Sequence, residues 1–165
     1  MIQDDRIFDI AIYLIRGGSM KFELWQATSL ATVHPAQRLP IEMESGERVL
    51  VSAQFPNGDW YAWTTRWLVS SFEGRQEKMS SEEVGAVEFG RFKGHPGLIN
   101  DPQAPLQSLV AIAQGKAGGT LRFRYELGYA AMGPMQCHKY WSLKHLILHK
   151  LMTPAEREKF RCSRG

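Results

Sequence analysis

The chain has 165 residues, of which 44% are apolar and 22% are charged, values typical of a folded globular domain. This balance argues against an intrinsically disordered chain, and no apolar run approaches the ~20 residues that a membrane-spanning helix needs. We therefore expect a single domain over residues 1–165, with no membrane partner and with a core that needs neither metal ions nor disulfides.

The net charge of +3 is unevenly distributed. Between His138 and Gly165, seven lysines and arginines face two glutamates, a balance of +5, so the rest of the chain carries −2. A basic end on a weakly acidic body predicts a negatively charged partner, either nucleic acid or an acidic protein surface.

The cysteine pattern favours a reducing compartment. Cys137 and Cys162 form neither a C-x-x-C pair nor a disulfide framework. Acidic residues precede and interrupt the apolar run near the N-terminus, which argues against a secretory signal. We therefore expect a cytoplasmic protein.

The N-terminal segment contains the most apolar run of the chain, residues 7–15. This run predicts a buried strand or a short helix, and its isoleucines favour the strand. Residues 16–19 predict a turn, and the alternation of charged and apolar residues over 20–27 predicts a half-buried strand. Met20 is a second candidate for the functional start, in which case residues 1–19 are an N-terminal extension.

A β-hairpin is the strongest local signal of the sequence. Residues 48–55 and 60–69 are rich in β-branched and aromatic side chains, and three of the five tryptophans lie in the second arm. Between the arms, Asn57-Gly58 supplies the positive φ angles that a tight connection needs. His34-Pro35 marks a loop before this hairpin, because a residue that precedes proline is disfavoured in a helix. The sequence thus predicts a meander around residues 48–72.

The segments around the hairpin complete the predicted sheet. Alternation over residues 40–44 predicts a further strand, and residues 73–78 read as a polar break. A serine cap followed by glutamates at residues 80–83 predicts a helix start. Apolar spacing predicts a second helix over residues 105–114, and strict alternation predicts a strand over 120–127.

The C-terminal part predicts helices. Gly133-Pro134 precedes a long helix over residues 135–152, and Thr153-Pro154 starts a last short one. The expected fold is α+β, with a mainly antiparallel sheet arranged as a meander and three to four helices, of which the longest is C-terminal.

Three hypotheses account for the histidines on that long helix. His138, His145 and His149 share one helix face with Ser142 at about 100° per residue. His145 and His149 are one turn apart and can bind zinc, although the sequence lacks the glutamate of the H-E-x-x-H motif. The same face can instead contact phosphates, or simply be solvated. We expect no metal and no cofactor.

Cys137 lies in the first turn of the same helix, where the helix dipole lowers the pKa of a thiol. Its alternatives are a nucleophile, which needs a neighbouring base, or a buried structural side chain. No complete catalytic set is identifiable, so we assign no catalytic residue.

The candidate binding residues are mostly cationic. Arg122 and Arg124 share one face of the strand over 120–127 and join the basic end if the final helices pack there. The candidate contacts to nucleic acid or a protein partner are Arg122, Arg124, Lys139, His145, His149, Lys150 and Arg161.

An aromatic surface is a second candidate. Trp60, Tyr61 and Trp63, beside Arg66, can stack on bases or form a homodimer seam, or they can be core residues.

We expect a small non-catalytic binding or regulatory protein whose basic C-terminal helices contact nucleic acid or an acidic protein surface. The alternatives are an inhibitor-type interaction module of a mobile or accessory genetic system, and an enzyme that uses Cys137 or a metal site at His138, His145 and His149.

Overall fold

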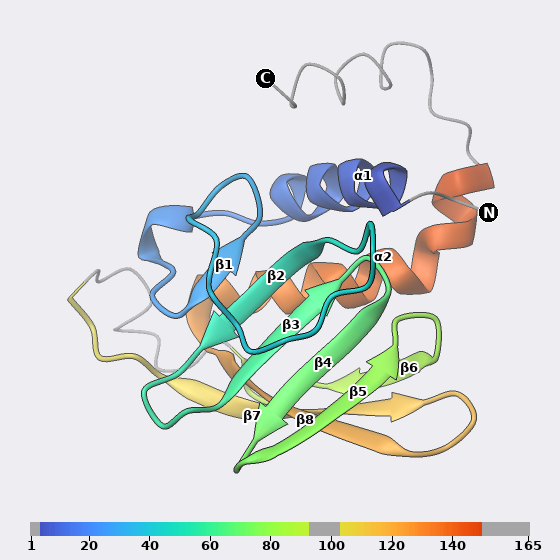
Figure 1. Cartoon of the computed structure of the whole chain (residues 1–165). Coiled ribbons are helices and arrows are strands. Elements are labelled where there is room, and N and C mark those ends of the chain that lie inside the picture. Colours follow the sequence, from blue (N-terminus) through green and yellow to red (C-terminus); the bar gives the residue numbers. More distant parts are fainter. Residues whose placement is uncertain (1–3, 93–102, 150–165) are drawn as a thin grey trace.

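The computed structural model describes residues 4–92 and 103–149, with only the backbone over 143–149. Two antiparallel sheets and two α-helices make up this part, so the expected α+β fold is confirmed (Figure 1). The two α-helices are fewer than the three to four expected. The last predicted helix, from Thr153, lies outside the described residues.

The elements follow one another as two sheets framed by helices. The first helix is α1 (Asp4–Gly17), and a 3-10 turn, η1 (Phe22–Leu24), follows it. Sheet A consists, in spatial order, of β1 (Thr28–Leu30), β2 (Val49–Gln54), β3 (Trp60–Thr64), β4 (Trp67–Phe72) and β5 (Arg75–Ser80). Sheet B consists of β6 (Val84–Glu88), β7 (Ser108–Gly115) and β8 (Thr120–Glu126). A second 3-10 turn, η3 (Gly128–Ala131), leads into α2 (Met132–His149).

The predicted hairpin is confirmed as β2 and β3. Gly58 has φ +95°, and the Asp59 amide donates to Asn57 Oδ1 at 3.0 Å, as a tight turn requires. The second arm is not one strand but two, because the chain reverses between β3 and β4. Thr64 Oγ1 makes this reversal by accepting the amides of Arg66 and Trp67 at 3.1 and 2.8 Å. The predicted polar break at 73–78 is also wrong, since a turn at 73–74 leads directly into β5.

The strand predicted over residues 7–15 is instead part of α1. Acidic residues in its first turn and Arg16 in its last turn complement the helix dipole. The run is largely apolar because much of the helix surface is covered, with Ile7, Ile10 and Ile15 all buried. The strands predicted over 20–27 and 40–44 are also wrong, because η1 lies in the first segment and irregular backbone forms the second.

The helices predicted near residues 80 and 105–114 are strands β6 and β7. In β7, Ala111 and Ala113 are fully buried opposite Phe123 and Leu121 of β8. The small side chains of β7 pack against the large ones of β8 and fill the core. Because these partners are distant in sequence, the spacing of apolar residues within 105–114 does not reveal them. The strand predicted over 120–127 is confirmed as β8, and the long C-terminal helix is confirmed as α2, although it begins earlier, at Met132.

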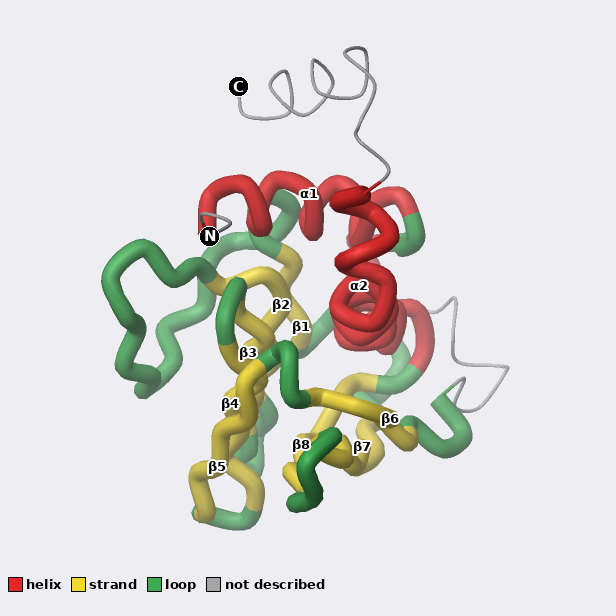
Figure 2. Tube along the Cα trace, turned by 90° about the vertical axis from the view of Figure 1, so that its right-hand side faces the viewer, coloured by secondary structure: helices red, strands yellow, loops and turns green. Residues whose placement is uncertain are grey.

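The core lies between the inner face of sheet A, sheet B and the two helices. Figure 2 shows sheet A nearly edge-on, with α2 on one side of it and sheet B below. Trp63, Tyr61 and Phe123 are fully buried in this core, and the Tyr61 and Phe123 rings lie 5.0 Å apart. Cys137 and Tyr140 of α2 belong to the same cluster.

A buried carboxylate joins the end of β8 to the start of β1. Glu126 Oε1 accepts the amides of Ala27 and Thr28 at 2.8 and 3.0 Å and the Thr28 hydroxyl at 2.8 Å, while Oε2 accepts the Gln26 amide at 2.8 Å. We call this contact the Glu126 junction. It satisfies three backbone amides that would otherwise lack partners at the edge of sheet A.

Candidate ligand-binding site

A long loop without regular secondary structure, residues 31–48, connects β1 to β2. It lies against the face of sheet A that is opposite to α2 (Figure 2). Loops longer than about 12–15 residues are uncommon in compact domains and are usually functional or disordered. This loop is held at its start, middle and end by specific polar contacts, so its conformation is defined by the sequence.

His34 fixes the start of the loop. Its Nδ1 accepts the Leu30 amide at 3.0 Å, so its Nε2 carries the proton and donates to the Phe22 carbonyl at 2.9 Å. The ring also stacks on Trp25 at a centroid distance of 5.2 Å. Because both ring nitrogens make hydrogen bonds, the His34 side chain positions the loop.

Gln37 fixes the middle of the loop. Its amide nitrogen donates to the Ala27 carbonyl at 2.9 Å, and its oxygen accepts the Ser52 hydroxyl at 2.8 Å. Gln54 adds a bond from its side-chain nitrogen to the Arg38 carbonyl at 2.8 Å. Strands β1 and β2 therefore hold the loop through side-chain amides and hydroxyls.

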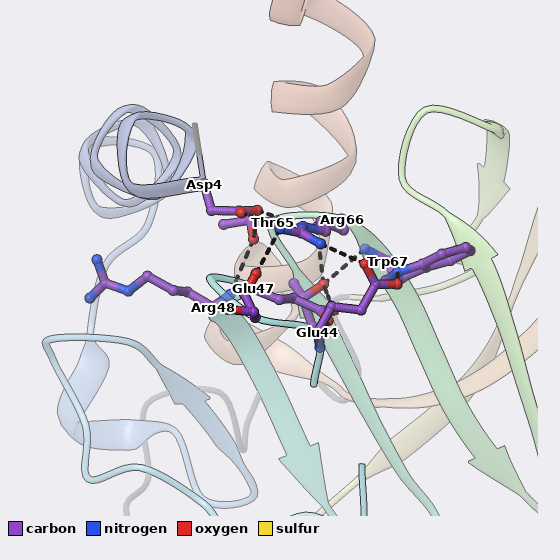
Figure 3. Close-up of polar contacts among 9 residues, drawn as sticks. Asp4, Glu44, Glu47, Arg48, Thr65, Arg66 and Trp67 are labelled. Carbon is purple, nitrogen blue, oxygen red and sulfur yellow. Dashed lines mark hydrogen bonds and ion pairs between the residues drawn. The ribbon is translucent and has the colours of Figure 1, made fainter. Parts of the chain in front are cut away.

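Arg66 fixes the end of the loop and also holds α1 (Figure 3). Its Nε and Nη2 donate to the two carboxylate oxygens of Asp4 at 3.0 and 2.6 Å, a bidentate pair. Its Nη1 donates to Glu44 Oε2 at 2.5 Å, and Trp67 Nε1 donates to the other oxygen of Glu44 at 3.1 Å. We call these residues, with Thr65, the Arg66 clasp, because one guanidinium joins the first turn of α1, the β3–β4 turn and the loop.

The clasp favours the charged forms of its members. The hydrogen bond from Arg66 is the main reason that the pKa of Asp4 lies below its ordinary value, and Thr65 adds to this effect. Hydrogen bonds from Arg66 and Trp67 likewise lower the pKa of Glu44, and the two carboxylates raise the pKa of Arg66. The clasp is therefore fully charged at neutral pH.

A cavity of about 390 Å³ lies between α1, the loop and strands β1 and β2. We call it the loop cavity. Phe8, Met43 and Val49 provide apolar lining, while Ser29, Ser52 and Gln37 provide polar lining. An apolar pocket of ~300–1,000 Å³ with a few placed polar groups is the usual form of a small-molecule site.

Charged side chains lie at one end of the loop cavity. Glu47 is buried, and its carboxylate accepts the Thr64 hydroxyl at 2.6 Å and the Glu44 amide at 2.8 Å. The Arg48 guanidinium lies over the Phe8 ring at 3.5 Å from its centroid and pairs with Asp5 at 3.3 Å. The cavity thus combines a carboxylate whose bonds are satisfied with a guanidinium that remains half-exposed.

Backbone strain occurs beside the cavity. Thr32 lines it and has φ +69°, a left-handed conformation that a β-branched residue rarely adopts. Strain of this kind costs on the order of 1–3 kcal/mol and tends to occur at functional sites. The fold therefore holds the loop in a conformation that Thr32 does not prefer.

A second cavity of similar size lies on the other side of the loop. Ile41 and Pro40 of the loop face Trp67 and Val69 of β4 across it, and Glu47 lines both cavities. Lys78 covers the Trp67 ring, with its Nζ at 4.1 Å from the centroid. This cavity has a more polar lining, and we assign no ligand to it.

The structure separates the predicted cationic residues. Arg122 and Arg124 alternate with buried Leu121 and Phe123, which share a core with Cys137 of α2. They therefore lie on the outer face of sheet B, whereas α2 packs against the inner face. The continuous positive surface expected from Arg122 to the basic helices is not formed by the described residues.

The two arginines differ in their contacts. Arg124 Nε donates to Asp59 Oδ2 at 2.8 Å and its Nη1 donates to Ser108 Oγ at 3.1 Å. Burial opposes ionisation of Asp59, but hydrogen bonds from Arg124 and from the Glu73 amide outweigh it, so the pKa of Asp59 lies below its ordinary value. Arg122 is exposed and lies 4.9 Å from the Phe72 ring centroid.

The predicted residues of α2 are only partly described. Lys139 is exposed, and His138 Nε2 donates to the Gly85 carbonyl of β6 at 2.7 Å, which attaches α2 to sheet B. His145 and His149 lie in the part of α2 for which only the backbone is described. Lys150 and Arg161 lie outside the described residues. Among the side chains that are described, no three histidines, cysteines or carboxylates are placed to hold a metal ion.

One interpretation of the sequence needs correction, and the structure favours one of the two alternatives for Cys137, the buried structural side chain. Trp60, Tyr61 and Trp63 are 6%, 0% and 0% exposed, so they are interior residues and not an aromatic surface. Side chains of β3 point alternately to the two faces of sheet A, and all three are buried because the core covers one face and the loop covers the other. Cys137 is also fully buried, and burial raises the pKa of its thiol well above the ordinary value, which removes the condition for a reactive thiolate.

Sequence reasoning missed the residues that form the loop cavity and the Arg66 clasp. The cavity lining comes from α1, β1, the loop and β2, and the clasp joins residues that lie up to 62 positions apart. One local signal was present, namely a long segment of weak periodicity that contains histidine, glutamine and proline. That signal indicates a loop but not the face that the loop covers.

Within the described residues, no helix is both long enough and apolar enough to cross a membrane. Comparisons with models of known protein families, with curated proteins and with solved structures find no match to this chain.

Proposed function

We propose that this chain is a non-catalytic binding domain that takes a small ligand in the loop cavity. The observation that carries the proposal is the cavity itself, about 390 Å³ with apolar and polar sides, beneath a loop whose conformation is fixed at both ends. These contacts hold the loop over the cavity, although the backbone of Thr32 is strained. Such an arrangement is expected of a preformed binding site.

A pocket-filling substitution tests the proposal. Ala36 is an exposed loop residue that lines the cavity, so Ala36→Trp should occupy the space without disturbing the core. Ala117→Trp is the matched control, because Ala117 is equally exposed in the β7–β8 turn and does not line the cavity. The probes are indole, phenol and octanol, and the readout is the amide NMR spectrum of residues 29–37 and 47–52.

At least one probe should shift these amides in the unmodified protein and in Ala117→Trp, and the shifts should vanish in Ala36→Trp. Shifts that are scattered over the surface, or that persist unchanged in Ala36→Trp, would show that the loop cavity does not bind small molecules.

Contact with nucleic acid is a second candidate function. One observation favours it: Arg122 is exposed on the outer face of sheet B, beside Arg124. In the register of β7 and β8, these two arginines lie opposite Ile112 and Val110. Guanidinium groups next to apolar sheet residues can follow a phosphate backbone and stack on bases. Exposed Lys139 and the cationic residues beyond α2 would extend this contact only if they reach the same strand of nucleic acid.

Fluorescence anisotropy of labelled single- and double-stranded DNA and RNA at two salt concentrations tests this candidate. Binding should weaken steeply with salt, and Arg122→Gln should weaken it further, whereas Arg16→Gln on α1 should not. Absence of binding at low salt would leave an acidic protein surface, including the target of an inhibitor-type module, as the partner of the basic residues.

A further inference from the structure

Among the described residues that line the loop cavity, Arg48 is the one lysine or arginine, and its contacts leave it available to a ligand. The guanidinium carbon lies over the Phe8 ring at 3.5 Å from its centroid, and one hydrogen bond, from Nη1 to Asp5, is formed by its donors. Its side chain is 41% exposed, and Figure 3 shows it extending away from the Arg66 clasp. A planar guanidinium held in this way presents a preformed fork of donors.

The ion pair of Arg48 is weak and replaceable. Its partner Asp5 is 67% exposed and lies at 3.3 Å, and exposed pairs of this kind contribute little to stability. The Asp5 carboxylate can return to water when another anion takes its place. Arg66, by contrast, has both ends of its guanidinium occupied by Asp4 and Glu44 and is not available.

The charges near Arg48 limit what that anion can be. Glu47 lines the same cavity, and both its carboxylate oxygens are used by Thr64 and the Glu44 amide. It therefore does not compete for Arg48, but its negative charge, together with that of Asp5, disfavours a ligand with several negative charges. One guanidinium beside two carboxylates therefore favours a ligand that carries a single negative charge.

The remaining lining sets the other half of the ligand. Phe8, Val49 and Met43 offer apolar contact, and Met43 is 38% exposed. A flexible methionine adapts to ligands of differing shape. Covering it would also remove exposed apolar area from water.

We infer that the ligand of the loop cavity is an amphipathic monoanion, a single carboxylate attached to an apolar chain or ring, with the carboxylate on Arg48 and the apolar part against Phe8, Met43 and Val49. This inference rests on the proposed function and names the chemical class that the cavity selects. Polyphosphates and nucleotides are disfavoured by the same two carboxylates.

Three probes that share one apolar chain test the inference: octanoate, octanol and octylamine. Titration calorimetry at neutral pH should show octanoate binding at least about tenfold more tightly than octanol, since a charge-assisted hydrogen bond is stronger than one between neutral groups. Octylamine should bind no better than octanol. Arg48→Gln should remove the preference for octanoate, and Arg48→Lys should keep part of it.

Arg75→Gln is the matched control, because Arg75 is an exposed arginine that also pairs with one carboxylate, Glu77, but does not line the cavity. It should leave the preference unchanged. Equal binding of octanoate and octanol, abolished by Ala36→Trp, would overturn the inference while leaving the proposed function intact. Binding of none of the three probes, together with no amide shift from indole or phenol, would overturn both.

Discussion

Two polar contacts join distant parts of the chain, one centred on a carboxylate and the other on a guanidinium, and they differ in almost every physical respect. The Glu126 junction is 4% exposed and accepts three backbone amides and one hydroxyl. The Arg66 clasp lies at the periphery, where the Arg66 side chain is 35% exposed and the Glu44 side chain is 49% exposed. The first closes the interior of the domain, whereas the second closes a loop over a cavity.

The difference shows how one chain can be both stable and open at a binding site. A buried carboxylate with every acceptor used is costly to break, because its removal leaves buried amides without partners. Ion pairs in contact with water are weakened by salt and cost less to break. The Glu126 junction is therefore expected to determine global stability, and the Arg66 clasp to determine the position of the loop.

The largest effect is expected from Glu126→Ala. Three amides, two of them fully buried, would lose their acceptor, and we expect the free energy of unfolding to fall by about 3 kcal/mol or more. Denaturant unfolding at low and moderate salt measures this, and the loss should be the same at both. Glu126→Gln, which keeps Oε1, is expected to lose less. A loss below that of an ordinary surface substitution would contradict the role given to the junction.

A smaller effect is expected from Arg66→Ala, and it should depend on salt. The substitution removes the links from the β3–β4 turn to Asp4 and to Glu44. The melting temperature should fall less than for Glu126→Ala, and the difference from the unmodified protein should shrink as ionic strength rises. Amide hydrogen exchange of residues 40–47 should become faster, while that of β8 should not. Equal acceleration in both segments would mean that the clasp supports the whole domain.

Acid should act first on the clasp. The folded-state pKa values of Asp4 and Glu44 are lowered, so the unfolded chain binds more protons than the folded chain in the acidic range. The stabilisation is therefore complete at neutral pH, begins to decline as the pH approaches about 4, and is lost as the pH falls through the lowered values.

Asp4→Asn should flatten this acid decline, while the stability of the variant should be nearly constant between pH 5 and 7, roughly the range above both ordinary carboxyl values. Melting temperatures measured from neutral pH to pH 3 would test whether stability falls as the pH falls. A decline in the unmodified protein that begins near neutral pH would point to a different group.

The smallest effect is expected from Tyr61→Phe. The Tyr61 hydroxyl is buried without a hydrogen-bond partner among the described residues, and burial raises its pKa well above the ordinary value. Deleting a buried hydroxyl that lacks a partner removes a desolvation cost, so the stability should be unchanged or slightly higher. A loss of more than about 1 kcal/mol would show that the hydroxyl is bonded.

The sequence was sufficient where structure is decided by neighbouring residues. Asn57-Gly58 predicted the β2–β3 turn, alternation over 120–127 predicted β8, and apolar spacing predicted α2. It was insufficient where tertiary contacts decide. The apolar run at 7–15 is helical because α2 and β2 cover it, and residues 108–115 are a strand because β6 and β8 pair with them on both sides.

The candidate site was largely beyond the sequence for the same reason. On the pattern of β8 alone, Glu126 belongs with Arg122 and Arg124, and nothing local indicates that it binds residues 26–28. Arg48 and Glu47 are adjacent, yet one is half-exposed and the other buried, because Thr64 reaches Glu47 from a neighbouring strand. The loop cavity depends on four separate segments meeting, which local periodicity cannot report.

The packing of α1 against α2 has a consequence for biosynthesis. Residues 4–17 leave the ribosome before α2 does, and the Gln136 side chain of α2 donates to the Gly18 carbonyl, at 3.2 Å, at the end of α1. Until more than a hundred further residues have been translated, the isoleucines of α1 have no helix to cover them. Until α2 has been made, the nascent chain therefore carries the apolar side chains of α1 without their cover, which makes this segment a target for a ribosome-associated chaperone.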